Sequence, residues 1–161
     1  MSEFDEAVIQ RIKQLEREVE RLQRWEQPVG KWQSYTVSWT ATTTNPSIGN
    51  GTLTGRYTQI GKTIMGNILL ICGSTTTFGS GYWIFSLPKV SASSNTPYLG
   101  NFAILDFGTG FYVGAIIIET GIGTFITTMR DGDGYGAFSS TLPHVWAVND
   151  KLQIAFTYET A

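Results

Sequence analysis

The leading segment of the chain repeats its apolar positions with the period of a coiled coil. In FDEAVIQRIKQLEREVERLQRW, residues 4–25, apolar residues are alternately four and three positions apart, which is the heptad spacing. These residues are Val8, Ile12, Leu15, Val19 and Leu22. We assign Ile12 and Val19 to heptad position a and the other three to d. Because the remaining positions are almost wholly charged or Gln, the pattern predicts a helix over residues 1–27 that needs partner helices to bury its seam.

The number of helices in the coil depends on two opposing features. Ile or Val at a with Leu at d favours two strands. RIKQLE, residues 11–16, instead resembles the signature of short three-stranded parallel coiled coils, in which Arg11 at g covers the core with its methylenes and pairs with Glu16 at e of the neighbour. We predict a parallel trimer with this ion pair. A dimer, and a helix that docks on another protein's bundle, are the alternatives.

After Pro28 and Gly30, which end the helix, the pattern changes to the alternation of β-strands. YTVSWTA, residues 35–41, places apolar and hydroxyl side chains on opposite faces. Seven further strands are predicted at 52–60, 62–72, 81–87, 98–107, 111–120, 123–130 and 151–159. The connections are short and rich in Gly, Ser, Thr, Asn and Pro, and FGTGF and ETGIGTF resemble hairpin turns. The sequence therefore predicts a mainly β chain, with an antiparallel jelly-roll-like sandwich over 35–161 and a linker over 28–34.

Charge divides the chain in the same way. Residues 1–31 carry six of the eleven Lys and Arg residues and seven of the thirteen Asp and Glu residues. The weakly charged remainder has no field to attract nucleic acid or anionic lipid, so we expect neither as a partner. The apolar runs are too short to cross a bilayer and the N-terminus lacks a signal core, so we expect no membrane insertion and no export by a visible signal. Cys72 lies in an apolar run and is predicted to be an inert core thiol.

NPSIGNGTLTGRYTQIGKT, residues 45–63, is dense in turn residues but has no catalytic group. We expect Gly51 and Gly61 at positions that need a positive φ or the absence of a side chain, and Gly55 at a bulge or a close approach. This stretch, with the preceding Trp39-Thr40 and the later GSTTTFGSGYWIFSLP of residues 73–88, resembles a β-rich C-terminal knob domain of tail-fibre, minor tail and other virion proteins of tailed bacteriophages. The resemblance covers most of residues 31–161. It implies a trimeric knob on a stalk.

The sequence offers few groups for catalysis, so we expect no enzyme, no cofactor and no metal. His144 is the single histidine, and we expect an ordinary loop or interface residue rather than a triad member. Glycoside hydrolysis needs a pair of carboxylates at a defined separation, and the scattered acidic residues of this sequence do not indicate such a pair. RDGDGYGAF, residues 130–138, resembles half of a calcium loop, but a hairpin turn is the simpler interpretation because the further oxygen ligands are absent.

Saccharide binding through aromatic and polar loop residues is the remaining possibility, because a ring can stack on a sugar while polar neighbours bond its hydroxyls. The candidates are Tyr82, Trp83, Tyr98, Asp131, Asp133, Tyr135 and Trp146. At most two or three of the aromatic rings should be exposed, since alternate strand residues belong to the core.

Together these features predict a phage virion protein at the particle surface, assembled in the host cytoplasm, that forms a homotrimeric fibre or knob for adhesion to a bacterial surface saccharide. A capsid-decorating or head-fibre protein, whose helix docks on other virion proteins, is the alternative. The start at Met1 directly into the predicted coil favours this alternative.

Overall fold

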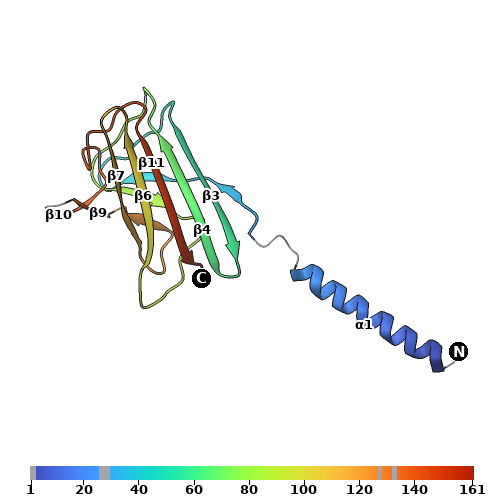
Figure 1. The fold of residues 1–161 in the computed structure, drawn as a ribbon. Helices are drawn as coiled ribbons and strands as arrows, with labels where there is room; N and C mark the ends of the chain where they lie inside the picture. The colour runs from blue at the N-terminus through green and yellow to red at the C-terminus, as the bar shows by residue number, and fades with distance from the viewer. Residues whose placement is uncertain (1–2, 26–29, 127, 132–133) are drawn as a thin grey trace. The chain divides into compact units, whose positions relative to one another are not determined.

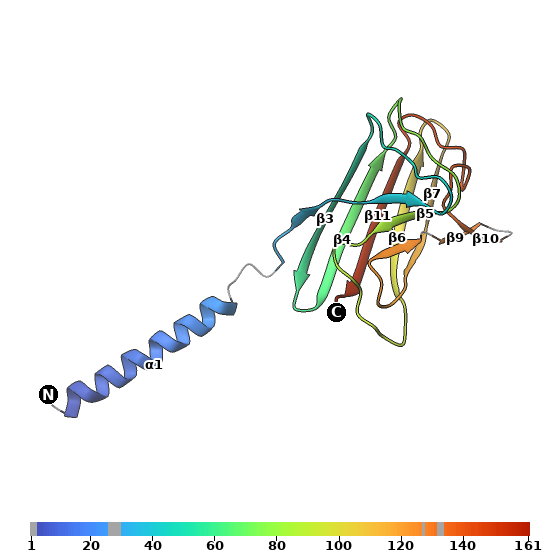
Figure 2. The same ribbon diagram turned by 180° about the vertical axis from the view of Figure 1, so that it is seen from behind.

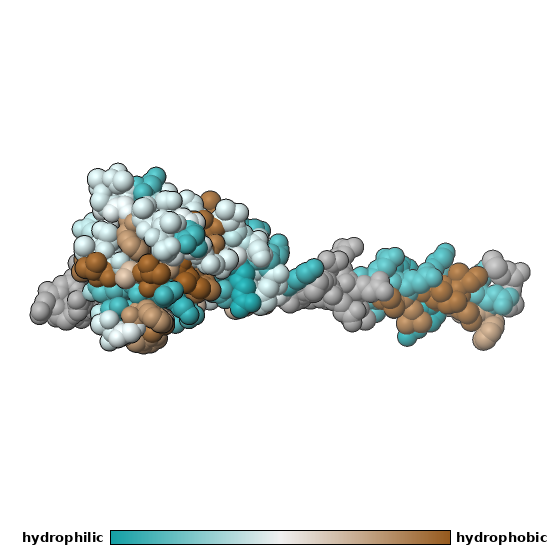
Figure 3. Space-filling view, turned by 90° about the horizontal axis from the view of Figure 1, so that it is seen from above, coloured by the Kyte–Doolittle hydropathy of each residue, from teal (hydrophilic) through white to brown (hydrophobic). Residues whose placement is uncertain are grey.

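The computed structural model describes residues 3–25, 30–126, 128–131 and 134–161. The chain forms two compact units, Met1–Lys31 and Trp32–Ala161. The first unit contains one helix among its described residues, α1 (Glu3–Trp25). Charged and Gln side chains surround an apolar stripe that runs along it (Figure 3). The predicted helix is therefore present, and its seam is open in the single chain.

The second unit is built from antiparallel strands. The described residues form a six-stranded sheet with the order β1-β3-β4-β11-β6-β7, which we call the long sheet (Figure 1). They also form a three-stranded sheet with the order β2-β5-β8, which we call the short sheet. The long sheet consists of β1 (Gln33–Tyr35), β3 (Thr52–Ile60), β4 (Thr63–Ile71), β6 (Tyr98–Asp106), β7 (Gly110–Ile118) and β11 (Lys151–Glu159). The short sheet consists of β2 (Trp39–Ala41), β5 (Trp83–Ser86) and β8 (Thr124–Ile126). β9 (Thr128–Asp131) and β10 (Gly134–Ala137) form a separate hairpin.

The two sheets face each other across one apolar core (Figure 2). Alternate residues of the long strands point inward, for example Ile64 and Ile68 of β4. The short sheet supplies large aromatic rings, and the ring of Phe125 lies 6.1 Å from that of Phe156 in β11. The mainly β, antiparallel architecture predicted from the sequence is confirmed, whereas the jelly-roll topology stays a prediction.

Three predicted elements differ from the structure. Residues 35–41 were expected as one strand, but β1 pairs with β3 of the long sheet and β2 pairs with β5 of the short sheet. The chain changes sheets between them, and β1 begins at Gln33, inside the predicted linker. ETGIGTF is not a hairpin turn, because it leads from β7 in one sheet to β8 in the other. The strand predicted at 123–130 is divided in the same way between the short sheet and the β9–β10 hairpin.

The glycines of residues 45–63 act by geometry, as predicted. Gly61, in the turn between β3 and β4, has φ +59°. Gly55 lies in unbroken register with β4 rather than at a bulge. A Cβ atom on Gly55 would meet the ring of Tyr35 and the side chain of Val37, so this position is a close approach, and a larger residue would have to displace one of these side chains.

We call the β unit, Trp32–Ala161, the head. A buried carboxylate, that of Asp150, connects the loops at one end of it. Asp150 Oδ1 accepts a hydrogen bond from the backbone N–H of Phe107 at 2.9 Å, and Oδ2 accepts one from Ala147 at 2.7 Å. Oδ2 also lies 3.0 Å from His144 Nε2, and the His144 ring stacks on Tyr112. His144 is a loop residue, as expected. Asp150 thus holds the β6–β7 turn against the segment that leads into β11.

Asp150→Ala is expected to lower the free energy of unfolding by about 3–5 kcal/mol, because it leaves two backbone N–H groups and a largely buried imidazole without their acceptor. Chemical denaturation followed by tryptophan fluorescence measures the change. The control is Glu159→Ala at an exposed carboxylate of β11, which should cost less than about 1 kcal/mol. Equal effects of the two substitutions would contradict the role given to Asp150.

Burial raises the pKa of the Cys72 thiol to about 12, and the nearby Asp150 adds to the rise. The thiol is buried at the end of β4, as predicted. Because only the thiolate reacts, the folded protein should not react with a thiol reagent at pH 8 over hours, and one equivalent should react at once in denaturant. Rapid labelling of the folded chain would contradict this placement.

Candidate functional site

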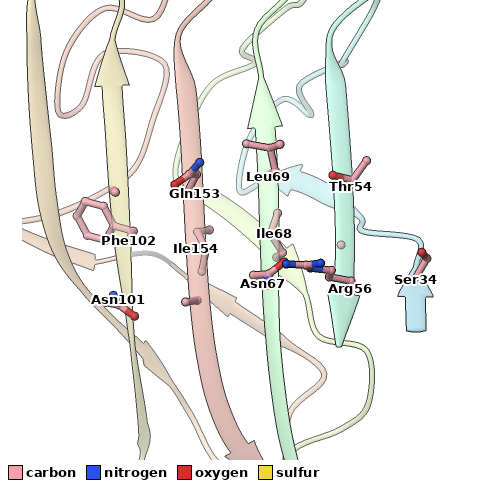
Figure 4. Close-up of a pocket in the computed structure, with 13 residues that line it drawn as sticks. Ser34, Thr54, Arg56, Asn67, Ile68, Leu69, Asn101, Phe102, Gln153 and Ile154 are labelled. Carbon is pink, nitrogen blue, oxygen red and sulfur yellow. The ribbon is translucent and has the colours of Figure 1, made fainter. Parts of the chain in front are cut away.

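The outward face of the long sheet contains a shallow hollow of about 520 Å³, here the sheet hollow. This volume lies within the range of small-molecule sites, about 300–1,000 Å³. The hollow extends from β1 across β3, β4 and β11 to β6 (Figure 4). Its polar lining residues are Ser34, Thr54, Arg56, Asn67, Asn101 and Gln153.

Strand register explains why these side chains meet. Arg56 of β3 is opposite Asn67 of β4, and Asn67 is opposite Ala155 of β11. Ala155 is in turn opposite Asn101 of β6. Arg56, Asn67, Ala155 and Asn101 therefore form a row across four strands. Because the methyl group of Ala155 is shorter than its polar neighbours, a depression forms above it. Gln153, two positions before Ala155 on the same face, closes one end of it.

Two contacts fix Arg56 at the side of the hollow. Its Nε donates a hydrogen bond to Asn67 Oδ1 at 3.1 Å, and Figure 4 shows the guanidinium directed toward Asn67. The guanidinium carbon also lies 4.8 Å from the centre of the Trp32 ring, which is within cation–π range. Trp32 itself is 46% exposed. The side chains of Arg56 and Trp32 thus form one cationic and aromatic corner.

The lining has the chemistry of a binding surface. The amides of Asn67, Asn101 and Gln153 each offer donors and an acceptor, the hydroxyls of Ser34 and Thr54 offer both, and the guanidinium offers donors alone. No carboxylate, histidine or cysteine belongs to the described lining. The hollow is therefore suited to a ligand with many hydroxyl groups, and Arg56 adds an attraction for an acidic group.

The aromatic residues predicted to bind a ligand do not form one exposed site. Trp83 and Trp146 are 0% and 3% exposed, and their rings lie 4.9 Å apart in the core. They present no free face and cannot stack on a sugar in this structure. Tyr98 is half-buried, whereas Tyr82 is 53% exposed. Of these four residues, Tyr82 is thus the exposed candidate, in agreement with the expectation that few of the rings would be free.

Two of the other predicted ligand residues, Asp131 and Tyr135, lie in β9 and β10. Asp131 ends β9 and Tyr135 lies in β10, where its partner in the register is Arg130. The side chains of Asp131 and Tyr135, and the whole of Asp133, lie outside the described residues. The antiparallel pairing of β9 with β10 confirms the hairpin interpretation for the described part of residues 130–138.

The predicted coiled-coil positions lie along α1 with their side chains open to solvent. Val8, Ile12, Leu15 and Val19 are 42–50% exposed, and the side chain of Leu22 lies outside the described residues. Within the single helix, Arg11 Nη1 donates a hydrogen bond to Gln14 Oε1 at 2.9 Å. The predicted pairing of Arg11 with Glu16 of a neighbouring helix stays a prediction.

One group of the described residues has the composition of a metal site. Potential ligand atoms of Asp106, His144 and Asp150 all lie within 4.8 Å of one another. However, both carboxylate oxygens of Asp150 already accept hydrogen bonds from the backbone, so the arrangement fits a structural tie better than an ion site. The Ser139 hydroxyl accepts from the Thr141 N–H and is not bonded to His144, so these residues do not form a nucleophile–base pair.

Sequence reasoning missed the sheet hollow, although a signal was present. Asn67, Asn101 and Gln153 are polar residues at outward positions of three long strands. Each could be recognised as an outward residue from the alternation alone. Their proximity could not be recognised, because it depends on β11 lying between β4 and β6.

Among the described residues, no helix has both the length and the apolar character needed to cross a membrane. No protein-family model matches the chain, and no solved structure matches it. It is similar to the Mu-like prophage FluMu defective tail fiber protein of Haemophilus influenzae, with 29% identity over 126 residues, which are 78% of this chain and 20% of that protein. The chain thus spans about a fifth of the length of this relative, and the likeness relates it in sequence to a phage tail fibre protein.

Proposed function

We propose that the chain is a structural part of a phage tail fibre, exposed on the virion, which assembles as a parallel homotrimer and adheres to a saccharide of the bacterial surface. The observation that carries this proposal is the sequence relationship to a tail fibre protein over 78% of the chain. The helix and the β unit supply complementary parts: α1 for assembly and the head for contact with the host. In this proposal the head is a jelly-roll-like knob without enzymatic activity.

The open seam of α1 supports self-assembly. The described seam residues Val8, Ile12, Leu15 and Val19 leave about half of each side chain in water, which is unfavourable by about 25 cal/mol per Å² of apolar surface. Three sister helices would bury the seam, and Arg11 could then exchange Gln14 for Glu16 of a neighbour. The coil has only three heptads and is marginal alone, so we expect the heads to contribute to assembly.

The sheet hollow supports the adhesive role better than the loop aromatics do. Its amides, hydroxyls and single guanidinium match a polyol that carries an acidic group, and Trp32 adds an exposed ring at the Arg56 side. Each hydrogen bond in such an open site contributes only about 0.5–1.5 kcal/mol. Three copies on one trimer would raise the strength of attachment through multivalency.

A purely structural role on the capsid is the rival function. The tail fibre relative favours the tail. Gold-labelled antibody against the head, viewed on intact particles by electron microscopy, separates the two positions. Label on the capsid would overturn the tail assignment.

In solution, the full chain should sediment at three times its chain mass of 17.8 kDa. Ile12→Asp should weaken the trimer at least tenfold, since three carboxylates would then meet in an apolar coil core. The control is Gln10→Asp at an outward heptad position, which should leave the mass unchanged. Analytical ultracentrifugation over a concentration series measures both. A monomeric wild-type chain with α1 still formed would contradict the assembly model.

Asn101→Ala and Gln153→Ala should each weaken binding of the full chain to a surface polysaccharide of the host about three- to tenfold, because each removes one amide from the sheet hollow. Asn95→Ala, at an exposed loop residue outside the hollow, is the matched control. Glycan arrays identify the ligand and titration calorimetry measures affinity. A ligand that binds all of these proteins equally would place the saccharide site elsewhere.

A further inference from the structure

We propose that the outward face of the β6–β7 hairpin packs against the same face of sister copies, so that the heads as well as the helices hold the trimer together. This inference rests on the homotrimer proposed above and adds the position of the head contact. The hairpin face is defined by Leu99 and Leu105 of β6 and by Phe111, Val113 and Ile117 of β7.

The side chains of the hairpin face are exposed to a degree that is unusual for residues of this kind. Leu99, Phe111 and Val113 are 69%, 65% and 67% exposed, and Leu105 and Ile117 are also exposed. Single exposed apolar residues are common, but a contiguous group marks an interaction surface.

The register shows that these residues form one patch. Leu99 is opposite Ile117, and Leu105 is opposite Phe111, so both ends of the hairpin face are pairs of large apolar residues. Between them Val113 is opposite Ala103. All these positions point away from the core, because the intervening residues, such as Phe102 and Ile116, are buried. The hairpin therefore has two apolar faces, of which one is covered.

The short segment between α1 and β1 favours a second copy of the chain as the partner that covers the hairpin face. Trp25 ends α1 and Gln33 begins β1, so eight residue steps separate them and span at most about 28 Å. Heads joined to one parallel coil therefore remain within reach of each other, at an effective concentration in the millimolar range. An apolar patch on each head would meet its sister patches before it met another protein.

The charge of the hairpin face also suits contact between identical surfaces. Around a symmetry axis, equivalent side chains lie near each other, so a charged residue there would face its own copies and repel them. The outward positions of β6 and β7 from residue 99 to residue 117 contain Leu, Asn, Ala, Phe, Val and Ile and no charged residue. The face can thus contact itself without a like-charge penalty.

The test introduces a charge on the hairpin face of the full chain. Val113→Asp should fold, because the side chain it replaces is mostly exposed, and it should raise the dissociation constant of the trimer at least tenfold. The control is Thr52→Asp, at an exposed outward position of β3 near the opposite edge of the same sheet. It should leave the dissociation constant of the trimer unchanged. Sedimentation over a concentration series gives the constants, and circular dichroism verifies folding of both variants.

Cross-linking gives a second, independent measurement. With buried Cys72 unreactive, a short bis-maleimide should join copies of Val113→Cys and should not join copies of Thr52→Cys. A trimer that is equally stable in Val113→Asp and Thr52→Asp, or that fails to cross-link through Val113→Cys, overturns the hairpin face as the contact and leaves the coiled-coil trimer intact. A monomeric wild-type chain overturns both.

Discussion

The packing of two sheets around one core determines both surfaces of the head. Once Ile64, Ile68 and Leu70 of β4 point inward, the residues between them must point outward, because side chains alternate along a strand. The same holds for β6, β7 and β11. Burial of the aromatic short sheet against the long sheet therefore sets which polar residues reach the sheet hollow and which apolar residues reach the hairpin face. A slip of one residue would exchange core and surface along a whole strand.

Much of this arrangement follows from local sequence. The alternation in KLQIAFTYE predicted a strand over residues 151–159, and β11 has these bounds. The helix and the β6–β7 turn, FGTGF, could be predicted in the same way, because each is specified by residues that are neighbours in the sequence. By contrast, YTVSWTA satisfies the alternation of a single strand, and its division between two sheets depends on Gly55 and Phe85, which lie far away in the sequence and pair with Tyr35 and Trp39.

The candidate site was beyond prediction for the same reason. Asn67 and Asn101 each precede a buried residue by one position and could be assigned to the outward face. They become neighbours across Ala155 because the last strand of the chain inserts between β4 and β6. Loop aromatics were a reasonable choice from sequence, but large rings such as Trp83 and Trp146 contribute more by filling the core between the two sheets than they would in solvent.

The long sheet combines two surfaces with different demands. The polar groups of the sheet hollow need to stay accessible to water or to a ligand, because burying them without partners is unfavourable. That cost would exceed the small gain from each hydrogen bond to a ligand. The hairpin face gains from leaving water. The two surfaces meet at β6, where outward Asn101 borders the hollow and outward Leu99 and Leu105 belong to the hairpin face. Contact centred on β7 would bury Phe111, Val113 and Ile117 and leave the polar residues of β3, β4 and β11 open, with Asn101 at the boundary between the two surfaces. In the trimer proposed above, this division would keep most of the proposed saccharide site outside the contact between heads.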